Sequence, residues 1–171
     1  MNVLKFALAS FFFCLLSISC GGDKKKEKES FSYENKSAVK EEIKEDSNIA
    51  NVVLVGDDAM KFDKSEIRVK SGQKVKLTLR HKGKMPITAM GHNVVILKKG
   101  VNVTAFASKA ALARDNNYIP KNSEDIIAFT ETIGGGQTTS IEFDAPEAGT
   151  YDFICSFPGH YAIMKGKFIV E

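Results

Sequence analysis

Hydrophobic and polar residues alternate along several short stretches in the second two thirds of the chain. The clearest is 74–80, KVKLTLR, which places Val75, Leu77 and Leu79 on one face and charged or polar side chains on the other. A period of two residues is the pattern of a half-buried β-strand. The stretches 65–70 and 139–144 alternate more briefly, and five others are rich in β-branched and aromatic residues: 52–55, 93–97, 125–130, 150–154 and 165–170. The pattern therefore predicts about eight short strands.

Turn signals separate these strands, and one segment departs from the β pattern. The turns are expected at Ser71-Gly72, Lys82-Gly83, Ala148-Gly149 and the glycine triplet 134–136. The triplet lacks the lysine and the helix of a phosphate-binding loop, so we interpret it as a hairpin turn. Residues 104–117, TAFASKAALARDNN, are rich in alanine and have the apolar spacing of a short helix. We therefore expect an all-β fold, a β-sandwich over residues 50–171 with one inserted helix.

The N-terminal 19 residues have the pattern of an export signal. Lys5 is followed by 14 uncharged residues, which is shorter than the ~20 apolar residues of a membrane-spanning helix. The stretch LLSISCGG then resembles the lipobox of bacterial lipoproteins, which implies cleavage after residue 19 and a lipid on Cys20; it departs from that pattern in having Ser17 where leucine is usual. A soluble secreted protein cleaved nearby is the alternative.

A charged segment separates this signal from the β pattern. Between Asp23 and Asp46, 15 of 24 residues are charged, with seven lysines and eight acidic residues. Such a composition buries too little apolar surface to offset the entropy of ordering, so residues 20–49 are predicted to be a lipidated cysteine followed by a flexible tether. The net charge of +3 is too small to suggest a nucleic-acid partner.

Soft metal ligands are concentrated near the C-terminus, where CSFPGHYAIM gives the spacing C-x4-H-x3-M with Cys155, His160 and Met164. Cys14 lies in the signal and Cys20 is the predicted lipid site, so Cys155 is the single thiol left to the domain and has no partner for an internal disulfide. Thiolate, imidazole and thioether favour copper, and a second imidazole is available at His92, in AMGHNVVIL, where a strand is expected to begin. Two histidines, one cysteine and a weak axial methionine are the blue-copper ligand set.

The stretches MGHN and CSFPGHYAIMKG resemble azurin, a small cupredoxin of bacterial electron transfer, and the similarity extends over about residues 50–171. The resemblance implies an eight-stranded Greek-key sandwich that holds one type 1 copper ion. It implies strong ligands at His92, Cys155 and His160, a long axial bond from Met164 and a weak approach by the Gly91 carbonyl. Asn93 matches a residue that joins the two ligand loops by hydrogen bonds, and Phe157 lies beside the ligands.

The sequence also departs from azurin. The domain lacks the two cysteines of the azurin disulfide, and Val94 stands where an aromatic residue is frequent. His81 matches a histidine near the site that is not a ligand, and we expect it to be structural.

Other chemistries and other roles remain to be distinguished. Zinc could use the same ligands, although copper(II) binds such sites more tightly. A Cys–His nucleophile fits poorly, because a thiolate that binds metal is not free to attack. Four protein ligands leave no open position for substrate, so we expect no enzyme activity. Copper storage or delivery in the cell envelope is the alternative to electron transfer.

The resemblance also implies a docking surface around the edge of His160. It consists of Met90, Phe157, Pro158, Gly159 and Ala162, with Tyr161 as a further candidate. An exposed apolar patch of this kind suits transient contact with redox proteins such as cytochromes or copper and haem oxidoreductases. The expected protein is a monomer, exported to the cell envelope and attached to a membrane by its N-terminal lipid.

The anchor can be tested by substitution of its cysteine. Wild-type protein should lose residues 1–19 and appear in the membrane fraction, whereas Cys20→Ser should block lipidation and disturb processing. Mass spectrometry of the mature N-terminus and membrane fractionation measure both effects. A fully soluble wild-type protein with an unmodified N-terminus at another position contradicts the lipoprotein prediction.

Overall fold

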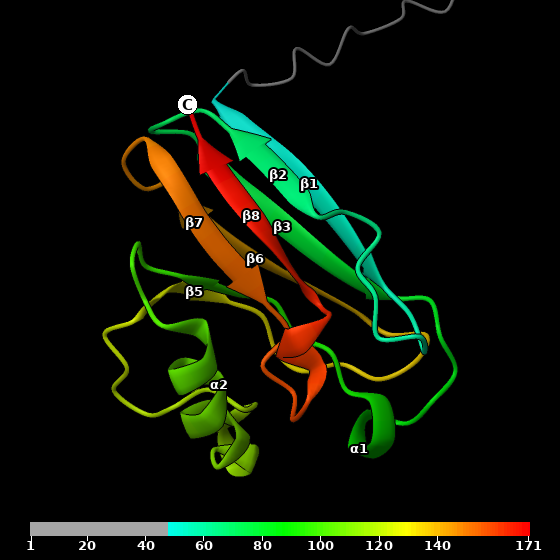
Figure 1. Cartoon of the computed structure of the whole chain (residues 1–171). Coiled ribbons are helices and arrows are strands. Elements are labelled where there is room, and N and C mark those ends of the chain that lie inside the picture. The colour runs from blue at the N-terminus through cyan, green and yellow to red at the C-terminus, as the bar shows by residue number, and fades with distance from the viewer. Residues whose placement is uncertain (1–47) are drawn as a thin grey trace, which may run out of the picture. The chain divides into compact units, whose positions relative to one another are not determined.

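Eight strands form two facing β-sheets in the computed structural model, which describes residues 48–171 (Figure 1). The eight-stranded sandwich with an inserted helix is therefore confirmed. The predicted signal, Cys20 and most of the predicted tether lie outside the described residues. The strands are β1 (Ile49–Gly56), β2 (Glu66–Val69), β3 (Lys74–His81), β4 (Val95–Leu97), β5 (Ile126–Phe129), β6 (Thr138–Asp144), β7 (Gly149–Ile154) and β8 (Lys165–Val170).

The strand order shows how distant segments of the chain are joined. One sheet has the order β1-β3-β6 and the other β2-β8-β7-β4-β5. β1 pairs with β3 and β2 with β8 in parallel, and the other pairs are antiparallel. β4 and β7 are neighbours, so the segments that precede β4 and follow β7 meet at one end of the sandwich.

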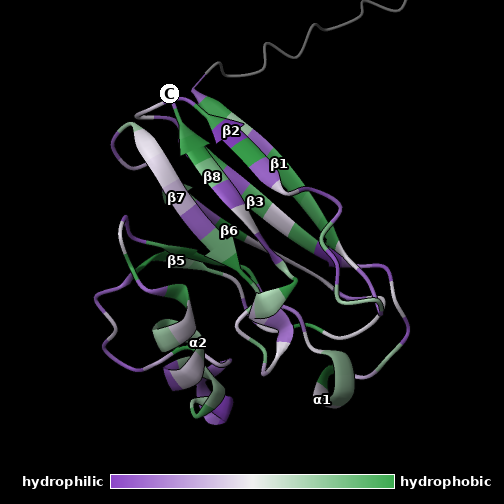
Figure 2. Ribbon diagram, in the orientation of Figure 1, coloured by the Kyte–Doolittle hydropathy of each residue, from purple (hydrophilic) through white to green (hydrophobic). Residues whose placement is uncertain are grey.

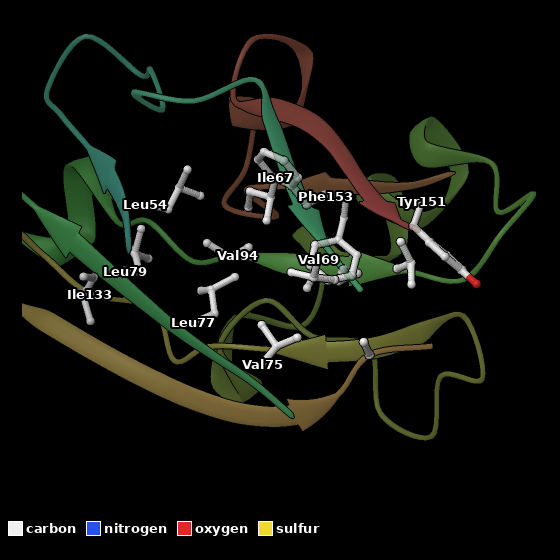
Figure 3. Packing of buried hydrophobic residues seen from close by; sticks show 14 residues of the cluster. Leu54, Ile67, Val69, Val75, Leu77, Leu79, Val94, Ile133, Tyr151 and Phe153 are labelled. Atoms are coloured by element: carbon white, nitrogen blue, oxygen red, sulfur yellow. The ribbon is translucent and has the colours of Figure 1, made fainter. Parts of the chain in front are cut away.

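The alternation along the strands produces the core between the sheets. Val75, Leu77 and Leu79 are all fully buried, as the pattern of β3 predicts. Figure 2 shows the alternation as hydrophobic and hydrophilic bands along β1 and β8. Leu54 from β1 and Phe153 from β7 are also fully buried, and in Figure 3 the side chains of both sheets point into the same layer. Fully burying one such side chain stabilises the fold by ~1.5–3 kcal/mol, so this layer is the main source of stability.

The inserted helix covers a second, smaller core. α2 spans Val103–Ala111, and its N-terminus is capped by the Asn102 side chain, which accepts a hydrogen bond from the Ala105 N–H at 2.9 Å. Phe106, Ala107 and Ala110 face inward and pack with residues of β4 and β7. The prediction of one helix over 104–117 was too long, because the helix ends at Ala111 and a short 3-10 turn, η1 (Arg114–Asn116), follows. No helix within residues 48–171 is long and apolar enough to cross a lipid bilayer.

Three local expectations need correction. β1 begins at Ile49, which was predicted to belong to the tether. The glycine triplet is not a hairpin turn, because β5 and β6 belong to different sheets and the triplet lies in the crossover between them. A four-residue helix, α1 (Ile87–Met90), was not expected; it follows Pro86 and lies just before the first candidate ligand.

The triplet is glycine because another loop packs against it. A Cβ at Gly135 would lie 2.6 Å from backbone atoms of Lys84, and one at Gly134 would lie 2.7 Å from the Ile87 nitrogen. A distance below 3.0 Å from backbone requires the loop to move. The triplet thus allows the 83–87 segment to approach the crossover.

We therefore expect Gly135→Ala to destabilise the protein by about 2 kcal/mol or more. Gly100→Asn is the control, since Gly100 has φ +82° and open space around it, and asparagine tolerates this conformation. Gly100→Asn should lose no more than about 1 kcal/mol of stability. Urea unfolding measures both, and equal stability of Gly135→Ala and wild type contradicts the packing argument.

Candidate metal centre

Three of the predicted ligands converge at the end of the sandwich where β4 begins and β7 ends. Cys155 directly follows β7, His92 lies three residues before β4 in an isolated bridge with Ile133, and His160 begins the short 3-10 helix η2 (His160–Ala162). His92 thus precedes the strand that it was expected to begin. The exposed fractions of the three residues are 0–3%, so all three are shielded from bulk solvent.

The distances between the donor atoms match those around a single metal ion. Cys155 Sγ lies 4.0 Å from His92 Nδ1 and 3.6 Å from His160 Nδ1, and the three atoms lie within 4.8 Å of one another. Two bonds of about 2.0–2.3 Å at trigonal angles place their donor atoms roughly 3.6 Å apart. The three side chains are therefore arranged at metal-binding distances.

Met164 and Gly91 border the same centre. Met164 is fully buried in a cluster with Cys155 and Phe157, and its backbone carbonyl accepts a hydrogen bond from the Cys155 N–H at 2.9 Å. The Gly91 carbonyl oxygen lies 3.9 Å from Cys155 Sγ. A Cβ at Gly91 would lie 2.7 Å from the Phe157 ring, so glycine is needed where this backbone meets the ring.

Contacts with Asp57 and His81 fix the tautomer and the orientation of the His92 ring. Its Nε2 lies 2.9 Å from the Asp57 carbonyl, which can only accept, so Nε2 carries the proton and Nδ1 presents its lone pair toward the sulfur. On its other side, the ring stacks on His81 at 4.2 Å between centroids. His81 is itself buried: its Nε2 donates to the Met90 carbonyl and its Nδ1 accepts from the Gly83 N–H.

The Asn93 side chain connects the two ligand loops. Its Oδ1 accepts the Ser156 N–H at 2.8 Å, and its Nδ2 donates to Ser156 Oγ at 2.8 Å and to the Asn117 carbonyl at 3.0 Å. The Ser156 hydroxyl donates in turn to the Tyr118 carbonyl at 2.8 Å. Neither Asn117 nor Ser156 was expected at the site. The Asn116-Asn117 pair could have indicated a turn at Asn117, because asparagine tolerates the left-handed conformation.

The predicted docking residues are at least partly exposed, with one exception. Pro158, Gly159 and Ala162 are exposed and Met90 is partly exposed, but Phe157 is only 8% exposed. Its ring packs against His160 and Tyr118, so it supports the surface from below. Three of the seven large exposed hydrophobic residues described, Met85, Ile87 and Ile163, lie within seven residues of a candidate ligand along the chain.

Burial controls the protonation of the candidate ligands. It raises the pKa of the Cys155 thiol to about 12, although the backbone N–H groups of Asn93 and Phe157 act in the opposite direction. Burial also lowers the pKa of His160 to about 4 and lowers the pKa of His92. Without metal, a neutral thiol therefore faces neutral imidazoles at pH 7, which leaves no thiolate for nucleophilic attack.

Comparison with known proteins agrees with this geometry. Residues 49–171 match the family described as copper binding proteins, plastocyanin/azurin family. The chain belongs to this family. It is a blue-copper protein of an electron-transfer family, a cupredoxin, and its cofactor is copper.

Individual relatives match most of the described domain. Azurin-1 of Alcaligenes xylosoxydans xylosoxydans is 42% identical over 120 residues, which cover 68% of this chain and 93% of that protein. The solved structure of azurin Az-iso2 from Methylomonas sp. strain J is 34% identical with a TM-score of 0.65, over 71% of this chain and 98% of that one. The "blue" copper protein auracyanin A of Chloroflexus aurantiacus superposes with a TM-score of 0.65 at 32% identity, over 72% of this chain and 99% of that one.

The pKa shifts predict how the stability of the metal-free protein depends on pH. The unfolded chain binds a proton at His160 near the ordinary pKa of 6.5, but the folded chain does so only near 4. Stability should therefore fall as pH decreases from 6.5 toward 4, by up to ~3 kcal/mol at about 1.4 kcal/mol per pKa unit. It should also fall above pH 9, where the thiol ionises in the unfolded chain but not in the folded one.

Urea unfolding of the metal-free protein at a series of pH values measures these changes. His160→Gln should reduce the loss of stability between pH 6.5 and 5, where few carboxylates titrate, and leave the part due to His92, whose pKa is also lowered. Cys155→Ser should reduce the loss of stability above pH 9. A wild-type protein with constant stability between pH 6.5 and 5 contradicts the assignment of a buried neutral His160.

Proposed function

We propose that the chain is a membrane-tethered type 1 copper protein that carries single electrons between redox partners outside the cytoplasm. In this proposal His92, Cys155 and His160 would be the strong ligands, and Met164 and the Gly91 carbonyl would be weak ones. The observation that carries the proposal is the buried Sγ and two Nδ1 atoms already at metal-binding distances. The proposed export and lipid anchor rest on residues 1–20 of the sequence.

Bound copper supplies a one-electron couple between its two oxidation states. The chain's contribution is to hold the donor atoms still, because electron transfer is faster when little structure changes with oxidation state. The Asp57 carbonyl holds the His92 ring, and the Asn93–Ser156 hydrogen bonds hold the backbone beside His92 and Cys155. The backbone N–H groups of Asn93 and Phe157 stabilise negative charge on the sulfur, which influences the reduction potential.

The burial of the ligands favours electron transfer over copper storage or delivery. A delivery site must let its ligands exchange, whereas Cys155 and His92 are fully buried and His160 is 3% exposed. A slow copper off-rate with fast electron self-exchange supports the carrier, and a fast off-rate with slow self-exchange supports delivery. We propose no catalytic role, since the ligand set leaves no open position for substrate.

Two substitutions distinguish the proposed roles of the ligands. Cys155→Ser should abolish the intense visible charge-transfer band, because its thiolate donor is gone. Met164→Leu should keep the band and raise the reduction potential, since loss of a weak donor favours the lower charge on copper.

Visible absorption and redox titration of the copper-loaded protein measure both effects. An unchanged band in Cys155→Ser eliminates this type of site. Complete loss of copper from Met164→Leu shows that Met164 is more than a weak axial ligand.

The proposed route for electrons leads through His160, because it is the only one of the three strong ligands flanked in sequence by exposed residues, Pro158, Gly159 and Ala162. A charge at the rim should hinder close apolar contact, so Met90→Lys or Ala162→Glu should slow self-exchange roughly tenfold or more without moving the visible band. Val53→Lys is the control, because Val53 is a similarly exposed apolar residue on β1, away from the ligand loops. Normal exchange rates in both rim variants show that electrons enter elsewhere.

A further inference from the structure

The positive charge of the described domain is concentrated in one segment, residues 98–121. This segment contains five cationic side chains and one acidic one, a net charge of +4. The other described residues contain eleven cationic and twelve acidic side chains, a net charge of −1. The segment comprises the turn after β4, the helix α2 and the loop that follows η1.

The cations of this segment are exposed and available to a partner. None of the five forms an ion pair with another residue in the range 48–171. They are Lys98, Lys99, Lys109, Arg114 and Lys121. Elsewhere in the domain, several surface cations are paired with carboxylates, for example Lys74 with Asp144 and Lys167 with Asp152.

Two surface hollows place most of these cations side by side. Lys99 and Lys109 line one hollow of about 340 Å³, together with Asp125. Lys109 and Lys121 line the next, of about 370 Å³, together with Leu112 and Asp115. Because Lys109 is common to both hollows, Lys99, Lys109 and Lys121 lie along one continuous surface beside α2, which we call the α2 basic face.

Leu112 lines the second of these hollows together with Lys109 and Lys121. It directly follows the last residue of α2 and is 89% exposed, the highest value among the large hydrophobic residues described. An exposed leucine that shares a hollow with Lys109, Lys121 and a single carboxylate, Asp115, does not help the fold. It has the composition of an interfacial membrane contact, in which an apolar side chain enters the headgroup region and cations contact anionic lipids.

We propose that the α2 basic face binds the surface of a membrane that contains anionic lipids, with Leu112 inserted between the headgroups. The proposal builds on the lipid-anchored electron carrier proposed above. From Cys20 to Asn48 there are 28 peptide links, a reach of at most about 100 Å, so an anchored domain always lies close to the bilayer. At such a high effective concentration, even a weak surface contact is populated.

Such docking would orient the electron-transfer end of the domain. α2 contacts η2, which contains His160, and Tyr161 packs against the core beneath α2. In Figure 1, α2 lies at the end of the sandwich opposite the start of β1. A domain resting on its α2 basic face therefore holds its His160 end near the lipid surface, where the exposed part of a membrane-bound redox partner is found.

A single tryptophan can report on this contact, because the sequence contains none. The full-length protein carrying Leu112→Trp is isolated with the N-terminus that the cell produces, and its copper is reduced. It is then combined with two kinds of vesicle. One contains phosphatidylcholine alone, and the other contains phosphatidylcholine with phosphatidylglycerol. We expect a blue-shifted emission and quenching by brominated lipid only with phosphatidylglycerol, and loss of both effects in high salt.

Matched charge reversals in the Leu112→Trp protein then locate the contact. Lys109→Glu with Lys121→Glu should weaken the association of the introduced tryptophan with phosphatidylglycerol vesicles roughly 30-fold or more. Lys61→Glu with Lys70→Glu changes the net charge equally at two exposed lysines outside the face and should have a much smaller effect.

Three outcomes overturn the proposal. The first is an identical tryptophan emission with both vesicle types. The second is an equal loss of vesicle association in both charge-reversal variants, because association then depends only on the total charge of the protein. The third is a vesicle response that persists in Lys109→Glu/Lys121→Glu while electron exchange with an acidic redox protein slows, because the face then binds protein.

Failure of the anchor remains distinguishable from failure of this proposal. A soluble, unmodified protein contradicts the lipid on Cys20, but its introduced tryptophan still responds to added phosphatidylglycerol vesicles if the α2 basic face binds lipid. An anchored Leu112→Trp protein whose tryptophan gives no response contradicts the basic face and leaves the anchor intact.

Discussion

The hydrogen bonds of the Asn93 side chain are the interaction on which the copper site depends. His92 and Cys155 come from segments 63 residues apart, and Asn93 and Ser156, their next neighbours in sequence, join these segments in the buried interior. Because this amide has no access to water, loss of one partner leaves a buried polar group unsatisfied at a cost of ~1–3 kcal/mol. The geometry of the donor atoms is thus maintained by the fold and does not require the metal to assemble it.

Close packing of backbone against side chains reinforces this arrangement. Gly56, at the end of β1, lies under the His92 ring, where a Cβ would come within 2.9 Å of its Cδ2 atom and 3.4 Å of the Met164 methyl. Gly91 lies against the Phe157 ring in the same way. These contacts restrict the movement of His92 and Met164.

Residues with regular local patterns could be predicted from the sequence. The alternation along β3 gave the correct buried face, and the spacing C-x4-H-x3-M, with His92, identified the side chains that now converge. The glycine triplet was misinterpreted because the choice between a hairpin and a crossover depends on which sheet each flanking strand joins. Residue spacing does not contain that information.

The remaining errors concern tertiary contacts. Asn117 takes part in the site through its left-handed backbone at φ 55°, which presents its carbonyl to Asn93 and its side chain to Thr132. Phe157 was expected both beside the ligands and in the exposed docking surface; its ring packs on His160, but the residue is only 8% exposed. The role of Asn117 does not follow from local sequence, because it depends on contacts with Asn93 and Thr132 in other parts of the chain.

The two exposed surfaces of the domain make different demands on a partner. The apolar surface around His160 gains from desolvation and is little affected by salt, whereas the α2 basic face gains from charge and is screened within about 10 Å at 0.1 M salt. A domain held only by its tether would meet its partner in many orientations, and few of them bring the His160 edge into contact. Docking through the α2 basic face would remove most of these orientations before the encounter, so the apolar surface can remain small and release its partner quickly. A weak, salt-sensitive contact with lipid and a weak, apolar contact with protein are therefore compatible with rapid turnover, since neither has to supply the whole affinity.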